Sequence, residues 1–469
     1  MEQQPRLPLW FFAVNCAVVL LAFVLGHQLA GWSRPKLPSP QSQAFDLVYQ
    51  EILKSHVDTQ DGAALLDRAI SAMARVDDYS LYVPPRELER YEESSTGRYE
   101  GIGVLQQVHG EALVVHFPFP DSPAERAGLR PGDCIVAVDG TAVASFPAEL
   151  RNAKVRELVR GPADSAVTLR VRRDDAEFDL AVRRGAVQRP AVKWAHLLSP
   201  GGRLGYLHLS DFHGGAAAEV LAAIERLAAD GPLRGLVLDL RHNLGGSLDE
   251  CVRLARAFQP SGTIVSTRRR DQVLTTLAAD PSQCRHAQLP LVLLVNHESA
   301  SASEVLAGCL QDHGRAALVG TRTFGKGFVN TVYTWGSLPF RLKLTTAHYY
   351  TPNGRNIDGM TQRRRNGSST APGEAAPAAG GIAPDFEVPA SEAERLAIAT
   401  TLAEIEPPAQ HLAALAKAAA VHGFAVPLPP QATTDPQLAK ALEVLAARAD
   451  AAETSSATPP APSQVPSGR

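Results

Sequence analysis

The chain has 469 residues, of which 45% are hydrophobic, and its formal net charge is −3 at pH 7. This length suffices for roughly two to four domains, and the apolar content suffices for a sizeable core. The nearly balanced charge gives no electrostatic footprint for nucleic acid, so we expect no nucleic-acid partner.

The first segment, residues 1–33, contains an uncharged apolar run from Leu7 to Trp32. A helix that spans a bilayer needs about 20 apolar residues, whereas the apolar region of a cleaved signal has roughly 7–15. Trp10 and Trp32 bracket the run, as aromatic residues do at membrane interfaces. We therefore expect a single-pass anchor in the inner (cytoplasmic) membrane, with the rest of the chain on the periplasmic or extracytoplasmic side. A cleaved signal and a buried core helix are the alternatives.

Residues 34–96 form a Pro/Ser-rich linker followed by helices, which we expect at FDLVYQEILKSHV, GAALLDRAISAMARV and PPRELERYEES. Their apolar positions recur at helical spacing, and a proline pair opens the third. Amphipathic terminal helices are candidate dimerisation elements, so a homo-oligomer is one partner that we consider. Packing of these helices on their own domain is the alternative.

The hydrophobic period changes to that of strands at residues 97–187. Two strands surround HGE, Ser122 and Pro123 open a short capped helix, and two alternating strands close the region. Order and lengths resemble a PDZ domain of the circularly permuted bacterial type. That resemblance implies that a peptide carboxylate is received by the backbone N–H groups of one loop. The loop residues are Gly101, Ile102, Gly103 and Val104.

Residues 188–390 alternate apolar strands with helical patterns, which predicts an α/β core with a mainly parallel sheet. Residues 391–452 read as a C-terminal helical region, and residues 453–469 as a disordered tail. The predicted fold class is therefore multidomain α+β, with a PDZ domain inserted between helical N-terminal and α/β segments.

The stretch ESASASEV, residues 298–305, follows the apolar strand PLVLLVN. A serine at a helix N-terminus either caps the helix, as S-x-x-E does here, or acts as a nucleophile beside free N–H groups. A nucleophilic serine needs a base, and the candidates are His297, His313 and Lys326. Lys326 lies between two glycines in an apolar stretch, and burial lowers a lysine pKa so that the amine can accept a proton.

The stretch LVLDLRHNLGG, residues 236–246, leads from an apolar strand through a glycine-rich turn into a helix. Its glycine N–H groups could supply half of an oxyanion hole. A plain strand–helix loop is the alternative.

These motifs together resemble the carboxyl-terminal processing peptidase (tail-specific protease) family, which has a Ser–Lys dyad and an inserted PDZ domain. The resemblance covers residues 44–390 and resumes at 435–448, and it includes NHESASASEV, TRTFGKG and LKLTTAHYYTPNGRNIDG. This chain has Asn330 where the family usually has a glutamine that bonds the lysine. The resemblance implies Ser301 as nucleophile, Lys326 as general base, Asn330 as its partner, Gly245, Gly246 and Ala302 as oxyanion-hole donors, and Asp312 as a supporting acid.

The resemblance also implies a serine endopeptidase that cleaves exported proteins near their C-termini, with the PDZ domain capturing apolar substrate tails. It implies no cofactor and no metal, and a requirement for an activating partner is left open. The alternative is a non-catalytic, membrane-anchored PDZ adapter on a protease-like scaffold.

Overall fold

The computed structural model describes residues 39–110, 112–199, 202–270, 272–359 and 380–457, in two units, residues 1–73 and 74–469. The predicted anchor at 1–33 lies outside the described residues. Across the described ranges, no helix combines the length and apolarity that a bilayer span requires. In the first unit, helix α2 (Pro40–Ser55) begins five residues before the predicted pattern because Ser39 caps it, and it buries no side chain. Helix α3 (Gly62–Ala74) follows, as predicted.

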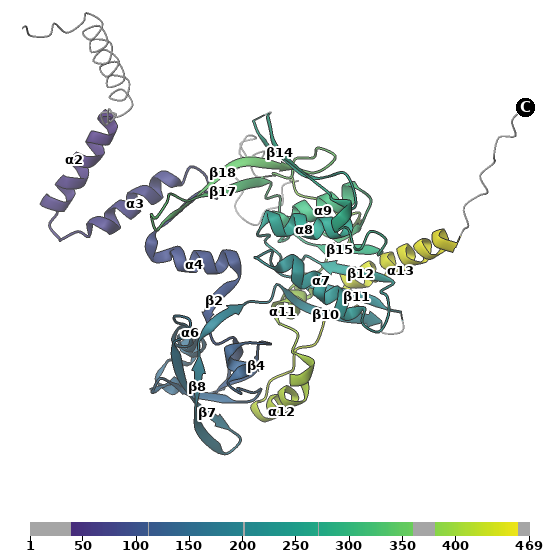
Figure 1. Cartoon of the computed structure of the whole chain (residues 1–469), viewed down its shortest axis with the longest axis horizontal. Coiled ribbons are helices and arrows are strands. Elements are labelled where there is room, and N and C mark those ends of the chain that lie inside the picture. Colours follow the sequence, from purple (N-terminus) through teal and green to yellow (C-terminus); the bar gives the residue numbers. More distant parts are fainter. Residues whose placement is uncertain (1–38, 111, 200–201, 271, 360–379, 458–469) are drawn as a thin grey trace, which may run out of the picture. The chain divides into compact units, whose positions relative to one another are not determined.

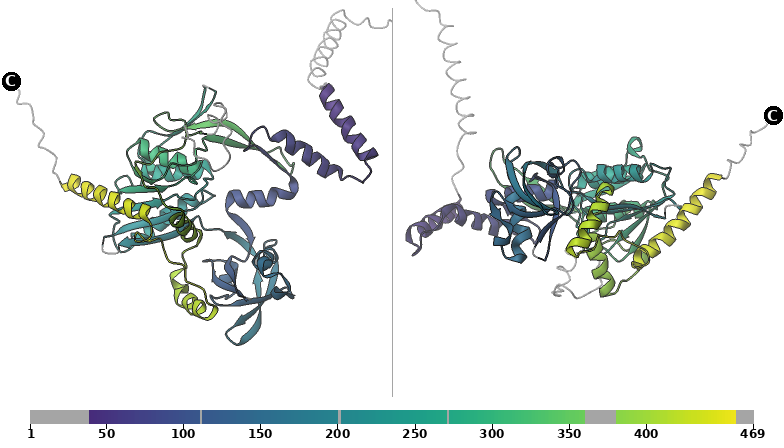
Figure 2. Two further views of the ribbon diagram at one scale, coloured as in Figure 1. Left: turned by 180° about the vertical axis from the view of Figure 1, so that it is seen from behind. Right: turned by 90° about the horizontal axis from the view of Figure 1, so that it is seen from below.

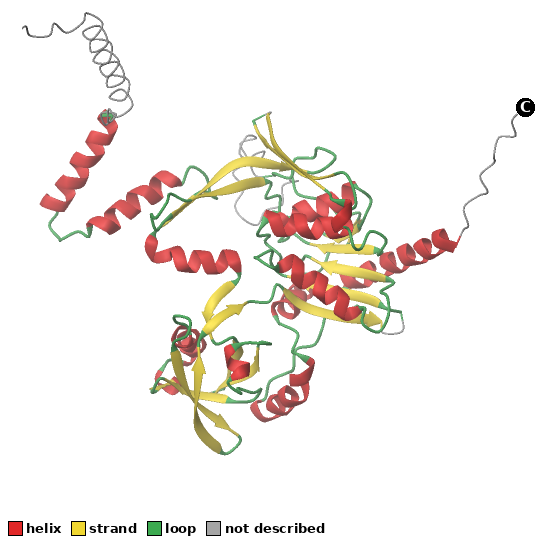
Figure 3. Cartoon of the chain, in the orientation of Figure 1, coloured by secondary structure: helices red, strands yellow, loops and turns green. Residues whose placement is uncertain are grey.

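A six-stranded sheet, parallel except at one edge, forms the centre of the second unit (Figures 1 and 3). Both of its faces are covered by helices, so its inner strands are continuous apolar runs, which made them predictable. In spatial order the strands are β10 (Val192–Ser199), β11 (Leu204–Leu209), β12 (Gly235–Asp239), β15 (Leu291–Val295), β16 (Ala317–Gly320) and β19 (Phe386–Glu387). The helices are α7 (Ala216–Leu227), α8 (Leu248–Phe258) and α9 (Ala302–Asp312) on one face, and α11 (Glu392–Ala403) and α13 (Pro436–Ala457) on the other.

A second, antiparallel sheet of the same unit was largely missed by the sequence analysis. Its strands are β1 (Leu81–Val83), β13 (Thr263–Arg269), β14 (Gln272–Ala278), β17 (Phe328–Tyr333) and β18 (Arg341–Tyr350). Strand β14 is almost wholly exposed, so burial imposes no alternation on its sequence. Strand β17 begins two residues after the predicted catalytic lysine, and its pairing with β18 therefore holds one end of the lysine's loop.

The region predicted as a PDZ domain has its own sheet and its own hydrophobic core. Helix α4 (Pro85–Thr96) leads into it, and Ser122 caps its short helix as predicted. Its strands are β2 (Arg98–Gly101), β3 (Val104–His109), β4 (Ala112–Pro118), β5 (Cys134–Val138), β6 (Thr141–Ala142), β7 (Ala166–Arg173), β8 (Ala176–Arg183) and β9 (Gly185–Gln188), and its helices are α5 (Pro123–Arg126) and α6 (Ala148–Val159). Among the residues that the structure describes, strand β3 pairs only with β4, so its other edge has no strand partner there.

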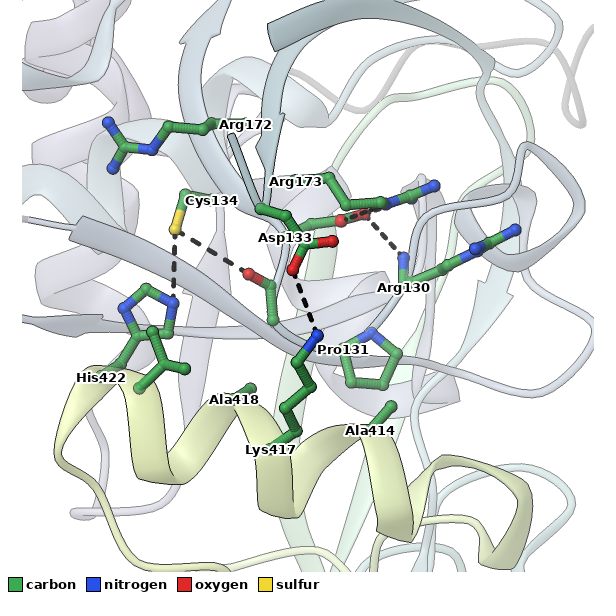
Figure 4. A pocket seen from close by; sticks show the side chains of 13 residues that line it. Arg130, Pro131, Asp133, Cys134, Arg172, Arg173, Ala414, Lys417, Ala418 and His422 are labelled. Atoms are coloured by element: carbon green, nitrogen blue, oxygen red, sulfur yellow. Dashed lines mark hydrogen bonds and ion pairs between the residues drawn. The ribbon is translucent and has the colours of Figure 1, made fainter. Parts of the chain in front are cut away.

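The C-terminal region divides between these two parts of the fold. Helices α11 and α13 complete the core of the central sheet, whereas helix α12 (Leu412–His422) packs on the PDZ strands (Figures 1 and 2). A cavity of about 360 Å³ lies between α12 and those strands, where Cys134 Sγ is 3.7 Å from His422 Nε2 (Figure 4). Helix α13 extends to Ala457, so residues 453–457, which were predicted as part of the disordered tail, are helical; the rest of that predicted tail lies outside the described residues.

Candidate active site

The three serines that follow strand β15 have different surroundings. The Ser299 hydroxyl is buried and donates to the Leu240 carbonyl at 2.8 Å. The Ser303 hydroxyl, also buried, donates to the Asn243 carbonyl at 2.9 Å. Ser303 lies inside the first turn of α9, and Ser301 is the residue at the N-cap, as the S-x-x-E pattern predicts.

Ser301 is half-buried and has a positive φ of 57°, which a residue with a side chain adopts only where its surroundings enforce it. Its backbone N–H donates to Glu304 Oε2 at 2.8 Å. Its hydroxyl has no acceptor among the residues that the structure describes. Of the three serines, Ser301 therefore has the hydroxyl whose proton is not already engaged.

Glu304 joins the serine to the loop of the predicted base. Its carboxylate, which is fully buried, also accepts from the backbone N–H of Lys326 at 2.8 Å, through the same oxygen that binds Ser301. The other oxygen accepts from Gly325 N–H at 2.7 Å and from Thr323 Oγ1 at 2.6 Å. The backbone nitrogens of Ser301 and Lys326 are thus within two hydrogen-bond lengths of each other. Burial raises the pKa of Glu304, and these four hydrogen bonds oppose the rise.

The ammonium of Lys326 is half-buried and lies 5.6 Å from the centre of the Tyr79 ring. It has no hydrogen bond or ion pair with any described residue. Burial lowers the pKa of Lys326, the positive charge of Lys343 lowers it further, and Glu304 partly opposes both effects. A lowered pKa increases the neutral fraction of the amine, which is the form that accepts a proton.

Asn330 does not take the place that the family's glutamine implied. Its amide donates to Thr345 Oγ1 at 3.2 Å, on the neighbouring strand β18, and no bond joins it to Lys326. The pairing of β17 with β18 shifts register between Val329 and Asn330. The short Asn330 side chain therefore bonds the paired strand β18, and Lys326 does not receive the hydrogen bond that the resemblance implied.

The glycine turn after β12 lies directly against the serine. A Cβ atom on Gly245 would be 2.6 Å from the Ala300 oxygen and 2.8 Å from Ser301 Cβ, and the φ of Gly245 is 98°. Only glycine allows this approach. The N–H of Gly245 donates to Asn243 Oδ1 at 2.9 Å, so it is not available to an oxyanion.

The N–H groups of Gly246 and Ala302 have no acceptor among the described residues. Ala302 is the first residue of α9, where the N–H groups are unpaired and the helix dipole favours negative charge. Of the two predicted glycines, Gly246 is therefore the one whose N–H group could donate to an oxyanion. Gly245 has the different role of allowing the turn to approach Ser301.

Asp312 lies at the opposite end of α9 from the serine. Its carboxylate accepts from the Asn353 N–H at 2.8 Å and pairs with Arg355. These bonds hold the loop that follows β18. Within the described residues, Asp312 therefore has a structural role and bonds none of the other predicted catalytic groups.

The predicted carboxylate loop of the PDZ domain also has unengaged donors. The carbonyls of Ile102 and Gly103 accept from Ala124 at 2.8 Å and from Phe119 at 3.0 Å. The N–H groups of Ile102 and Gly103 have no acceptor in the described part of the chain. The free edge of β3 begins at Val104, immediately after this loop.

Two residues that hold the site together, Glu304 and Asn243, were not predicted from the sequence. Glu304 was interpreted only as the glutamate of S-x-x-E. In the folded chain its carboxylate is buried between two loops, where it accepts four hydrogen bonds. Asn243 was not singled out. Its side chain binds Gly245 and the Leu209 carbonyl, and its own carbonyl accepts from Ala300 and Ser303. The Asn-x-Gly-Gly spacing was the available signal, because Asn commonly bonds a backbone N–H two residues later.

Comparison with known proteins identifies the family of this chain. The model of peptidase family S41 matches residues 203–364, and that of the PDZ domain matches residues 120–173. A carboxy-terminal-processing protease of Bartonella bacilliformis is 34% identical over 326 residues, covering 68% of this chain and 73% of that protein. A probable CtpA-like serine protease of Staphylococcus haemolyticus is 31% identical over 340 residues, covering 71% and 66%. The solved photosystem II D1 C-terminal processing protease is 29% identical with a TM-score of 0.40, covering 75% and 94%. The chain therefore belongs to peptidase family S41: it is a serine-type peptidase that contains a PDZ domain and is related to the carboxy-terminal-processing proteases.

Proposed function

We propose that this peptidase cuts protein substrates near their C-termini, with Ser301 as nucleophile and Lys326 as general base. The observation that carries the proposal is the Glu304 carboxylate, which binds the backbone N–H groups of both residues through one oxygen. Membership of the peptidase family leaves no reason to keep the adapter alternative.

The proposed reaction begins with neutral Lys326 accepting the proton of the Ser301 hydroxyl. The serine oxygen then attacks the scissile carbonyl, and the oxyanion that forms accepts hydrogen bonds from the N–H groups of Ala302 and Gly246. Lys326 returns the proton to the leaving amine. Water, activated by the same lysine, hydrolyses the acyl-enzyme and restores both groups.

Substrate selection is assigned in this proposal to the PDZ domain. The unengaged N–H groups of Ile102 and Gly103 would bind the terminal carboxylate of a substrate. The preceding residues of the tail would add as a strand to the free edge of β3. Apolar tails fit this mode, because alternate side chains of an added strand face the domain.

We further propose that the apolar segment 7–32 anchors the peptidase in the inner membrane, so that its substrates are exported proteins. The length of the uncharged run supports this part of the proposal.

The experiment compares wild type with Ser301→Ala and Lys326→Met in the full-length, detergent-solubilised chain. The substrate is a fluorescent protein with an unstructured tail ending in three apolar residues, and its pair ends in three aspartates. Each variant should lose about 10³-fold or more in rate, as in other activated-serine systems. Lys417→Met, at an exposed lysine, is the matched control and should behave as wild type. Equal digestion by wild type and Ser301→Ala would refute the proposal.

A further inference from the structure

A fully buried arginine lies at the start of the oxyanion turn. All five N–H donors of the Arg241 guanidinium are engaged, and none of its surface is exposed. Asp239, at the end of β12, binds it at distances of 2.6 to 3.0 Å. Asp435 binds it through two oxygens at 2.7 and 3.1 Å, and Gln437 Oε1 accepts at 3.1 Å.

Two of these three acceptors come from the C-terminal region, 194 and 196 residues along the chain from Arg241. Asp435 precedes α13 and also accepts the N–H groups of Gln437 and Leu438, each at 3.1 Å. Gln437 donates in turn to the Val388 carbonyl at 2.8 Å. The first turn of α13 is thus built around the guanidinium.

The same arginine fixes the turn that leads to the proposed oxyanion hole. Its N–H donates to Asp239 Oδ1 at 2.9 Å, and its carbonyl bonds His208 Nε2 at 3.2 Å. Two residues later, Asn243 holds Gly245 and the start of α9. A displacement of Arg241 therefore moves the segment that carries the Gly246 N–H.

The buried charges are not needed to attach the helix. Helix α13 already packs on the sheet through apolar side chains that are almost fully buried, among them Leu438, Ala441 and Leu445. Burying an ion pair costs desolvation, and replacement by apolar residues is often neutral or stabilising. The network is better explained by the geometry that it imposes on the turn.

We infer that Asp435 is a positioning residue for this peptidase, holding the oxyanion turn in place through Arg241. The C-terminal helix is then part of the catalytic frame. The inference rests on the proposed function, because it assumes that the Gly246 N–H receives the oxyanion.

The test compares wild type with Asp435→Asn in the full-length chain. Leu445→Ala is the matched control, because it loosens the same helix by a cavity without touching Arg241. The readouts are kcat and KM on the apolar-tailed reporter, affinity for a peptide boronate that mimics the tetrahedral intermediate, and hydrogen exchange of residues 240–247. We expect Asp435→Asn to lower kcat and boronate affinity about 10- to 100-fold, with KM within about twofold, since misplacement by about 1 Å costs 10²-fold.

The control should keep kcat and boronate affinity within about threefold of wild type at a temperature where both variants are folded, because it leaves the turn intact. Faster exchange in residues 240–247 should appear only in Asp435→Asn. If that variant does not fold, Gln437→Met, which removes one acceptor, should give the same pattern more weakly. If Asp435→Asn and Leu445→Ala had equal effects on every readout, the inference would be overturned. The proposed function would still stand in that case, provided that the wild type cleaves the reporter. Turnover by Ser301→Ala would instead overturn the proposed function.

Discussion

Replacing Glu304 by glutamine tests the feature on which the site depends most. The carboxylate accepts four hydrogen bonds, two at each oxygen, in a fully buried position. Glutamine keeps one accepting oxygen and presents an NH₂ group to the other two donors. Two bonds to a charged group are therefore lost, each worth about 1.5–3 kcal/mol, so we expect a loss of about 3–6 kcal/mol in unfolding free energy.

The kinetic effect should exceed what the loss of stability explains. If the glutamine NH₂ group faces Ser301 and Lys326, their N–H groups lose the oxygen that holds them together, and a misplacement of about 1 Å costs about 10²-fold in rate. We expect kcat to fall at least that far under conditions where the variant is folded. The assay combines denaturant unfolding with single-turnover cleavage of the apolar-tailed reporter.

The chain offers a matched control in a second capping box. Glu394 accepts from the N–H and hydroxyl of Ser391 at 2.7 Å each, on the exposed start of α11. Glu394→Gln should cost no more than about 1 kcal/mol, as other helix caps do, and leave the rate unchanged. If Glu304→Gln were folded and cleaved within threefold of wild type, the carboxylate would not be what aligns the two residues.

Four further predictions concern the base, the turn and the tail site. Lys343→Met removes a positive charge that lowers the pKa of Lys326, so the rising limb of kcat/KM should move to higher pH, and an unchanged limb would contradict this. Folding lowers the pKa of Lys326 below its usual value of 10.5, so between the folded-state pKa and 10.5 the unfolded chain binds more protons than the folded chain. The unfolding free energy of the wild type should therefore rise with pH in that range, and Lys326→Met should lose this rise in parallel denaturation series. Gly245→Ala would place a Cβ atom 2.8 Å from Ser301 Cβ, and kcat should fall by about 10²-fold or more with the PDZ domain still binding peptide. Gly103→Ala, with a φ of 73° and a Cβ 2.6 Å from Ser122 Cβ, should weaken tail binding about tenfold in fluorescence anisotropy and spare cleavage of a short peptide; equal tail affinity would argue against the loop.

The sequence predicted the elements that burial dictates. The inner strands of the central sheet, β11, β12, β15 and β16, and the helices between them came from apolar runs and helical spacing, and the position of Ser301 at a helix start followed from them. The edge strands β10 and β19 were not predicted. Strand β14 was missed because exposure leaves no such pattern.

The site itself was predicted only as far as local spacing reaches. The pattern S-x-x-E is the same at Ser301 and at Ser391, and only the folded chain reveals that one glutamate is buried against the loop of Lys326. Gly246 rather than Gly245 is the available donor because the Gly245 N–H donates to Asn243 Oδ1, which only the folded chain shows. Asn330 does not bind Lys326 as predicted, and the register shift beside it could not be foreseen from the sequence. The contact between Arg241 and Asp435 joins segments too distant in sequence for any spacing rule.

The packing of α12 on the PDZ strands affects how this domain can be isolated. The apolar side chains of Phe117, Phe119 and Val187 are covered in part by Leu415 and Phe424, which belong to the C-terminal region. A fragment cut at residues 97 and 187 would expose that apolar surface to water and would be prone to associate with itself. Ligand screening on the domain alone would then report on an artificial face, and a chimaera that retains residues 404–426 would be the sounder reagent.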